Sequence, residues 1–226
     1  MTAGRAASGR PLAPRFYARP TLVVARELIG AVLVHDGPDG RVAGRIVEVE
    51  AYVGESDPAC HAAPGPTPRN APLYGPPGRA YVYLNYGMHC LLNAVTEADA
   101  RPAAVLIRAA EPLEGLELMR ARRTRPGGVP PPDVALCRGP GNLGRAFGIT
   151  LAENTRDLTS GPLTILRGDP APVVRWTPRI GLTRGQERHW RCVAADSRAV
   201  SGPRAWVAEG LPAPRPARAV ADRRRA

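Results

Sequence analysis

The sequence predicts a mixed α+β domain. Its 226 residues fit one large domain better than two, and a hydrophobic share of 44% is enough to build a core without metal or disulfide staples. The first half is rich in strand patterns, and the second half has short strands separated by turns. Because strands are not regularly followed by helices, a doubly wound parallel sheet is not expected.

The clearest element is a strand over residues 42–53, where apolar and polar side chains alternate with the period of a strand that is buried on one face. One face carries Val47, Val49, Ala51 and Val53, and the other carries Glu48, Glu50 and Tyr52. We therefore expect a half-buried strand whose second face holds two carboxylates and an aromatic ring.

The remaining elements follow in order along the chain. Residues 81–86 and 103–108 are expected to form strands, the second of them central, and residues 111–123 a helix with Glu111 and Glu114 in its first turn. Shorter strands are expected over residues 162–167, 172–176 and 190–194.

Composition divides the chain into three parts. Residues 1–14 and 211–226 are rich in Ala, Arg and Pro without a hydrophobic period, so we expect flexible segments around one domain at 15–210. The stretch 126–132, PGGVPPP, is expected to be an exposed loop inside that domain.

Charge favours a polyanionic partner. All 31 cationic side chains are arginine, against 20 Asp and Glu, which gives a net charge of +11. The absence of lysine excludes a Schiff-base side chain and a P-loop clamp. A GC-rich coding bias explains why the cations are arginines, but it does not explain their excess over carboxylates, so we favour nucleic acid.

The cysteines and the start of the chain indicate a protein of the reducing cytoplasm. Cys60, Cys90, Cys137 and Cys192 form no CxxC pair, and we find neither a secretory signal nor an apolar run long enough to span a membrane. Cys60-His61 and His89-Cys90 are adjacent pairs without metal-ligand spacing, so no metal is expected.

Glu50 is the first candidate for chemistry. It lies two positions from Tyr52, so both side chains project from one face of the strand, and a carboxylate beside a ring in a dry site can serve as a general base. The alternative is a solvated surface glutamate. Glu48 shares that face, and the pattern does not decide which of the two carboxylates is the solvated one.

Tyrosines crowd the stretch that follows. Tyr81 and Tyr83 share a strand face and can offer a stacking surface to a planar ligand, although tyrosines also pack in ordinary strand cores. Tyr86, on the other side and next to Gly87, is expected to protrude from a turn.

Two loops carry weaker signals. Thr67-Pro68-Arg69-Asn70 offers a hydroxyl, a guanidinium and an amide, which suit phosphate contacts but also suit an ordinary surface loop. Residues 139–144 spell GxGxxG, but no good strand precedes them, so a turn or a helix start is expected in place of a dinucleotide site.

Several linked motifs resemble the alkyladenine (3-methyladenine) DNA glycosylases of the methylpurine type. The resemblance extends over roughly residues 17–195. Its motifs are RIVEVEAY at 45–52, Asp57, His61, TPRN at 67–70, YVYLNYGM at 81–88, Asn93 and LIRAAEPLEG at 106–115.

The resemblance implies a fold, an activity and a partner. It implies a monomeric, single-domain α+β enzyme with a curved, mainly antiparallel sheet flanked by helices. The enzyme would flip alkylated or deaminated purines out of duplex DNA and hydrolyse the N-glycosidic bond in base excision repair. It would need no cofactor and no membrane, and it would leave an abasic site. A cytoplasmic enzyme, associated with the nucleoid if bacterial, is expected.

The resemblance also implies site residues. Glu50 matches the general base that activates water. The base-pocket positions are matched by Tyr52, His61, Tyr83, Asn93 and Arg108, with Asn93 on the pocket floor against normal guanine. Tyr86 matches the side chain that wedges into the duplex. Thr67, Arg69 and Asn70 match loop positions that contact DNA.

This chain departs from the family pattern in places, and other functions stay open. Asn85 replaces an apolar residue beside the wedge, and His89 replaces an aromatic residue. One alternative is a non-catalytic nucleic-acid-binding protein that uses the tyrosines and arginines. Another is a formyl- or nucleotide-handling enzyme that uses the loop at Gly139.

Overall fold

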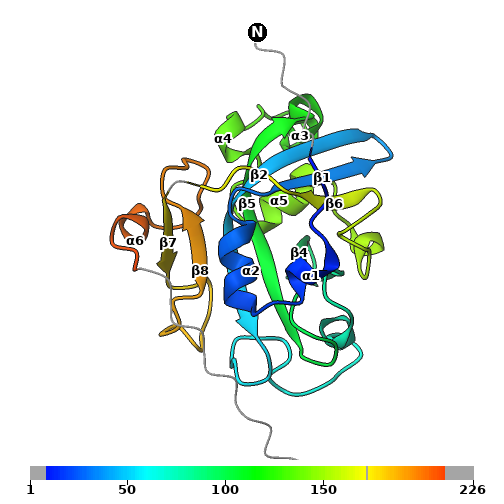
Figure 1. Cartoon of the computed structure of the whole chain (residues 1–226). Helices are drawn as coiled ribbons and strands as arrows, with labels where there is room; N and C mark the ends of the chain where they lie inside the picture. The colour runs from blue at the N-terminus through cyan, green and yellow to red at the C-terminus, as the bar shows by residue number, and fades with distance from the viewer. Residues whose placement is uncertain (1–8, 172, 212–226) are drawn as a thin grey trace, which may run out of the picture.

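The structure, a computed structural model, describes residues 9–171 and 173–211, and within them one curled antiparallel sheet organises the chain (Figure 1). The strands are β1 (Val32–Gly37), β2 (Gly40–Val53), β3 (Ala80–Asn85), β4 (His89–Val95), β5 (Ala103–Glu114), β6 (Leu163–Leu166), β7 (Val174–Thr177) and β8 (Arg191–Ala194). Six α-helices accompany them: α1 (Pro14–Tyr17), α2 (Thr21–Leu28), α3 (Leu116–Arg123), α4 (Asp133–Leu136), α5 (Pro140–Phe147) and α6 (Arg204–Ala208). The predicted α+β class with a curved antiparallel sheet is confirmed.

The long strand β2 holds the sheet together. The order is β3-β4-β5-β2-β1-β6, and β8 joins β2 beyond the end of β1, with β7 outside it. β1 pairs with residues 40–45 of β2, and β8 pairs with Glu48, Val49 and Glu50. A register shift between Ile46 and Val49 separates the two halves on the β5 side. The second half of β2 therefore receives a neighbour from far along the chain.

Both faces of β2 are buried, which corrects the expected half-buried strand. Val47, Val49 and Ala51 belong to the main core together with Val24 and Leu28 of α2, which crosses this side of the sheet in Figure 1. On the other face Glu48 and Glu50 have no exposed surface. Alternation of polar and apolar residues indicated solvent there, but the carboxylates are covered by the chain around β8 and neutralised by arginines.

The segment expected as a helix over 111–123 is a strand first and a helix afterwards. β5 continues to Glu114, and only α3, from Leu116, is helical. Arg45 of β2 donates to Glu111 at 2.7 and 2.9 Å, a cross-strand pair that fixes this extension. Gly115 then turns the chain with φ 76°, a left-handed conformation that glycine adopts without strain.

The described ends of the chain are paired with the sheet. Leu12 is buried and its N–H donates to the Ile165 carbonyl, so residues 9–14 do not behave as the flexible segment expected there. Leu211 forms an isolated bridge with Trp176. The rest of the two expected flexible segments, residues 1–8 and 212–226, lies outside the described residues.

The GxGxxG segment opens helix α5, as expected for a helix start. Gly139 precedes the helix, and the element before it is the short helix α4, so no βαβ unit surrounds the motif. Residues 126–132 form the expected loop. In the part of the chain that the structure describes, no helix has the length and apolarity that crossing a bilayer would require.

Candidate active site

The pairing of four strands aligns the site residues in one row. Glu50 of β2 faces Leu106 of β5, Leu106 faces Asn93 of β4, and Asn93 faces Tyr81 of β3. Side chains opposite one another on neighbouring strands project from the same face. Residues separated by up to 56 positions along the chain are thus brought to one side of the sheet.

Glu50 is held by three donors from three different elements. Its Oε2 accepts the Tyr52 hydroxyl at 2.8 Å and Arg108 Nη1 at 3.1 Å. Its Oε1 accepts the backbone N–H of Ile180 at 2.7 Å. Burial and the neighbouring Glu50 carboxylate raise the pKa of Tyr52 well above its usual value, so its hydroxyl keeps the proton that it donates.

Glu48, the second carboxylate on this face, has a different environment. Oε1 accepts Arg108 Nε, Arg191 Nε and Ser201 Oγ, each at 2.8 Å, and Oε2 accepts the Ser201 N–H at 2.6 Å. Burial opposes the ionised form of Glu48, but Arg108 and Arg191 outweigh that effect and lower its pKa. Two glutamates and two arginines therefore make a neutral, buried cluster.

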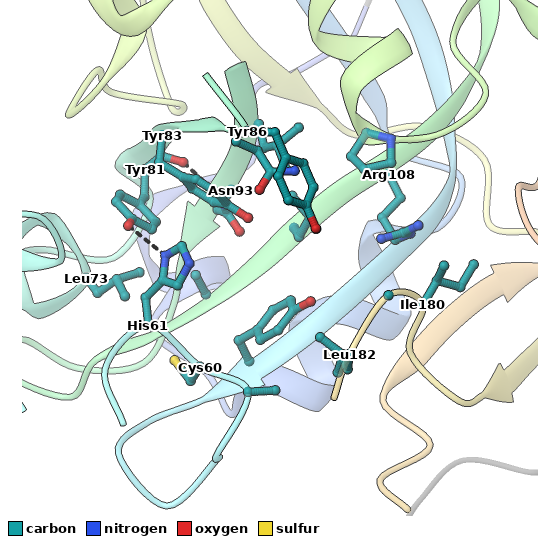
Figure 2. Close-up of a pocket in the computed structure, with 18 residues that line it drawn as sticks. Cys60, His61, Leu73, Tyr81, Tyr83, Tyr86, Asn93, Arg108, Ile180 and Leu182 are labelled. Atoms are coloured by element: carbon teal, nitrogen blue, oxygen red, sulfur yellow. Dashed lines mark hydrogen bonds between the residues drawn. The ribbon is translucent and has the colours of Figure 1, made fainter. Parts of the chain in front are cut away.

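A pocket of about 360 Å³ opens beside this cluster (Figure 2). Tyr81, Tyr83, His61 and Asn93 lie on one side of the opening, and Arg108 and Ile180 lie across from them. The other lining residues are Tyr52, Ala59, Cys60, Leu73, Asn85, Tyr86, Leu91, Ala104, Leu106, Pro140, Gly181 and Leu182. Glu50 does not line the pocket, but its three donors Tyr52, Arg108 and Ile180 all do.

Rings form the wall of the pocket. His61 packs against Tyr83 edge to face at 4.5 Å, and Tyr81 lies 5.5 Å from Tyr83. His61 Nδ1 is 2.9 Å from the Tyr81 hydroxyl. Burial raises the pKa values of Tyr81 and Tyr83 to about 12 and, with Arg69, lowers that of His61. The wall is thus aromatic and uncharged, as a surface that stacks on a nucleobase requires.

Asn93 and Tyr86 both line the pocket but differ in exposure. The Asn93 side-chain amide donates to the Tyr81 carbonyl at 3.0 Å, which fixes its orientation on the buried floor. Tyr86 follows β3 with φ 49° and is 84% exposed, so it projects from the β3–β4 turn as expected. Met88 on the same turn is 73% exposed.

The three residues of the loop at 67–70 that are expected to contact DNA differ in exposure. Thr67 and Arg69 are exposed, and the Arg69 guanidinium lies 5.9 Å from the centre of the Tyr83 ring. Asn70 is buried, and its amide donates to the carbonyls of His61 and Gly65 at 2.8 and 2.9 Å. The expected contact of Asn70 with DNA is therefore not supported by this geometry, because its side chain is committed to bracing the loop.

The adjacent cysteine and histidine pairs do not converge. Cys60 and His61 line the pocket, and the His89 ring lies against Gly141 of α5. Within residues 9–171 and 173–211, no three His, Cys, Asp or Glu side chains are grouped so that they could hold a metal ion.

The sequence alone did not point to the segment that covers Glu50. Asp57 and Arg179 form a fully buried ion pair with contacts of 2.6 and 2.8 Å, and Arg179 precedes Ile180, the backbone donor to Glu50. The turn-rich stretch around Pro178 and Gly181 gives no periodic signal. Backbone donors carry no signature in the sequence, so this part of the site became visible only in the fold.

Comparisons with known proteins agree with this geometry. The family model described as methylpurine-DNA glycosylase matches residues 15–198. A protein of Methanocella arvoryzae named "Putative 3-methyladenine DNA glycosylase" is 50% identical over 196 residues, covering 84% of this chain and 96% of the relative.

Relatives from bacteria carry the same printed name. One from Rhodopseudomonas palustris is 47% identical over 194 residues, covering 85% of this chain and 89% of the relative. One from Rubrobacter xylanophilus is 46% identical over 187 residues, covering 82% and 94%. The family match and these identities span the sheet, the Glu50 cluster and the tyrosine wall. The chain belongs to the methylpurine-DNA glycosylase family and is a hydrolytic DNA glycosylase of DNA repair.

Proposed function

We propose that this enzyme flips alkylated or deaminated purines out of duplex DNA and hydrolyses their N-glycosidic bond with a water that Glu50 activates. The observation that carries the proposal is the position of Glu50. Its carboxylate is buried and held by Tyr52, Arg108 and Ile180, all three of which line the ring-walled pocket.

The hydrogen bonds leave Glu50 room for one water. A carboxylate offers about four acceptor positions, and three donors occupy Glu50. The remaining position is on Oε1, and a water that reached it from the pocket could donate to Glu50. As the water oxygen bonds to the sugar C1′, its proton passes to Glu50, and the electrons of the broken glycosidic bond leave with the base.

The charge of the leaving base determines whether it must be protonated before it can leave. A purine alkylated at a ring nitrogen, such as 3-methyladenine, carries a positive charge and leaves as a neutral molecule. Hypoxanthine must gain a proton, and we assign no general acid. The chain contains no lysine to attack C1′, so the reaction should stop at the abasic site.

The pocket accounts for recognition of an extruded base. Unstacking a base costs a few kcal/mol, less for a badly paired lesion. Stacking between Tyr52, His61 and Tyr83 would offset that cost, and Asn93 on the floor would reject the extra amino group of guanine. Outside the pocket, Tyr86 would fill the gap left in the duplex, and the exposed Thr67 and Arg69 would contact the backbone.

The test is incubation of the full chain with duplexes that each carry one lesion: 3-methyladenine, 7-methylguanine, hypoxanthine or an etheno adduct. Release of the free base, with strand breaks appearing only after alkali, supports the proposal. Tight binding to lesion DNA without base release would favour the non-catalytic nucleic-acid-binding alternative. Breaks without alkali would contradict the reaction that stops at the abasic site.

A further inference from the structure

Arg179 is a fully enclosed cation near the site. Its side chain has no exposed surface, and it binds Asp57 through both Nη atoms, at 2.6 and 2.8 Å. Nη1 also donates to the Ala51 carbonyl at 3.0 Å, and Nη2 donates to the Gly185 carbonyl at 3.3 Å. Arg179 thus ties strand β2, the turn at Asp57 and the loop at 178–190 to one guanidinium.

Two aromatic rings lie close to the same guanidinium. Its central carbon lies 4.8 Å from the centre of the Tyr52 ring and 5.3 Å from that of Trp190. Arg188 lies 4.7 Å from the same Trp190 ring and 3.7 Å from Asp57. A guanidinium bound to a carboxylate and close to two rings cannot rotate or shift without changing these contacts.

Two of the three donors to Glu50 depend on this arrangement. Ile180, whose N–H binds Glu50 Oε1 at 2.7 Å, is the residue directly after Arg179. Tyr52, whose hydroxyl binds Oε2 at 2.8 Å, carries the ring on which Arg179 stacks. Only Arg108, the third donor, is fixed independently, by Glu48.

Stability alone does not explain a buried pair of this kind. Removing two charges from water costs several kcal/mol per ion, and well-packed apolar residues often replace a buried ion pair without loss. What the bidentate contact supplies is a fixed distance and plane. That property is useful where a neighbouring backbone N–H must meet a carboxylate oxygen.

We propose that the Asp57–Arg179 pair is a positioning device for catalysis, in which Arg179 holds the Ile180 N–H and the Tyr52 hydroxyl on the Glu50 carboxylate. The proposal rests on the proposed function. Neither Asp57 nor Arg179 lines the pocket, so both act through Glu50 and its donors, without contact with the base.

The proposal predicts a change in pH dependence as well as in rate. The charged and titratable groups around Glu50 are Glu48 and Tyr52 on β2, Tyr83 on β3, Arg108 on β5 and Arg179 on the loop. A variant at Arg179 changes only those hydrogen bonds to the Glu50 carboxylate that Arg179 holds in place. Loss of hydrogen bonds to the carboxylate disfavours its ionised form, so the acid limb of the pH–rate profile should move to higher pH.

The decisive variant is Arg179→Lys, which keeps the charge but lacks the planar fork that binds both Asp57 oxygens at once. We expect the single-turnover rate of base release to fall on the order of 10- to 100-fold, the size of effect that misplacement by about 1 Å produces. Affinity for lesion duplex should fall less than the rate, since Arg179 does not line the pocket and does not contact the rings of His61 and Tyr83. The double variant Asp57→Asn/Arg179→Gln replaces the ion pair with an uncharged pair and should show the same loss of rate. It provides the test if the lysine variant does not fold.

The control is Arg45→Lys, which breaks a contact of two arginine nitrogens with one Glu111 oxygen elsewhere on β2. It should leave the rate and the pH profile unchanged. A folded Arg179→Lys enzyme with the wild-type rate and acid limb would overturn the proposal while the glycosylase function stands. Equal rate losses in the Arg45 and Arg179 variants, without a shift of the acid limb, would also overturn it. Absence of base release by the wild-type chain would instead contradict the proposed function.

Discussion

The carboxylates of Glu48 and Glu50, two residues apart on β2, are bridged by a single guanidinium, with Arg108 Nε on Glu48 and Nη1 on Glu50. Their remaining partners differ. Glu48 otherwise binds Arg191 and Ser201, neither of which lines the pocket, whereas the other two donors to Glu50, Tyr52 and Ile180, both line it. The structure thereby distinguishes two residues that the strand pattern left equivalent: the further partners of Glu48 lie away from the pocket, and those of Glu50 lie on its wall.

The first prediction concerns stability. Glu48→Gln should lower the free energy of unfolding by about 3–5 kcal/mol, because it leaves Arg191 and Arg108 buried with a neutral partner. Urea titration at neutral pH measures this loss. Glu117→Gln is the control, since Glu117 is an 88% exposed side chain whose pair with Arg120 should contribute little.

The same carboxylate gives stability a defined pH dependence. The pKa of Glu48 is lower in the folded chain than its ordinary 4.5, so its contribution is complete above that pH and is lost as the pH falls through the folded value. In Glu48→Gln the acid side of the stability profile should flatten. An unchanged profile would contradict the neutral-cluster description.

The second prediction concerns the exposed wedge. Tyr86→Ala should weaken lesion-DNA binding by roughly 5- to 100-fold, as expected from the loss of one stacked ring worth about 1–3 kcal/mol. Because Tyr86 is 84% exposed, Tm should be nearly unchanged. Fluorescence of 2-aminopurine opposite the lesion, with thermal melting of the free protein, separates the two effects. A large drop in Tm would show that Tyr86 has a structural role instead.

The third prediction uses the histidine of the pocket wall. Burial and Arg69 lower the pKa of His61 below 6.5, and its Nδ1 lies 2.9 Å from the Tyr81 hydroxyl, whose own pKa is about 12. The unfolded chain gains a proton at His61 more readily than the folded one, so stability is complete above pH 6.5 and falls below it. His61→Gln should therefore lose less Tm than wild type between about pH 7.5 and 5.5. An equal loss in both proteins would argue against this assignment.

Local patterns in the sequence predicted which neighbouring side chains share a strand face, but they did not predict where every element ends. The period of two in residues 42–53 placed Glu50 and Tyr52 on one face, and the tyrosine spacing placed Tyr81 and Tyr83 together, because both features are local. The helix expected from Glu111 failed because cross-strand pairing with Arg45, a long-range contact, outweighed local helical preference.

Contacts distant in sequence account for the rest. Arg191 pairs with Glu48 across 143 positions, and the Ile180 N–H reaches Glu50 across 130. Neither the composition nor the periodicity of a single sequence indicates contacts between such distant positions. Asn70 is a different case. Its motif is visible in the sequence, but only the structure shows that its side chain is buried and binds the loop backbone.

The central claim is that the Glu50 carboxylate activates the attacking water, and Glu50→Gln tests it most directly because the amide keeps the shape of the side chain but cannot take a proton from water. Single-turnover release of a damaged purine should fall by about 10²–10⁴-fold, the usual contribution of a general base, while lesion-duplex affinity stays within a few-fold of wild type. Base release at the wild-type rate by a correctly folded Glu50→Gln enzyme would contradict the account.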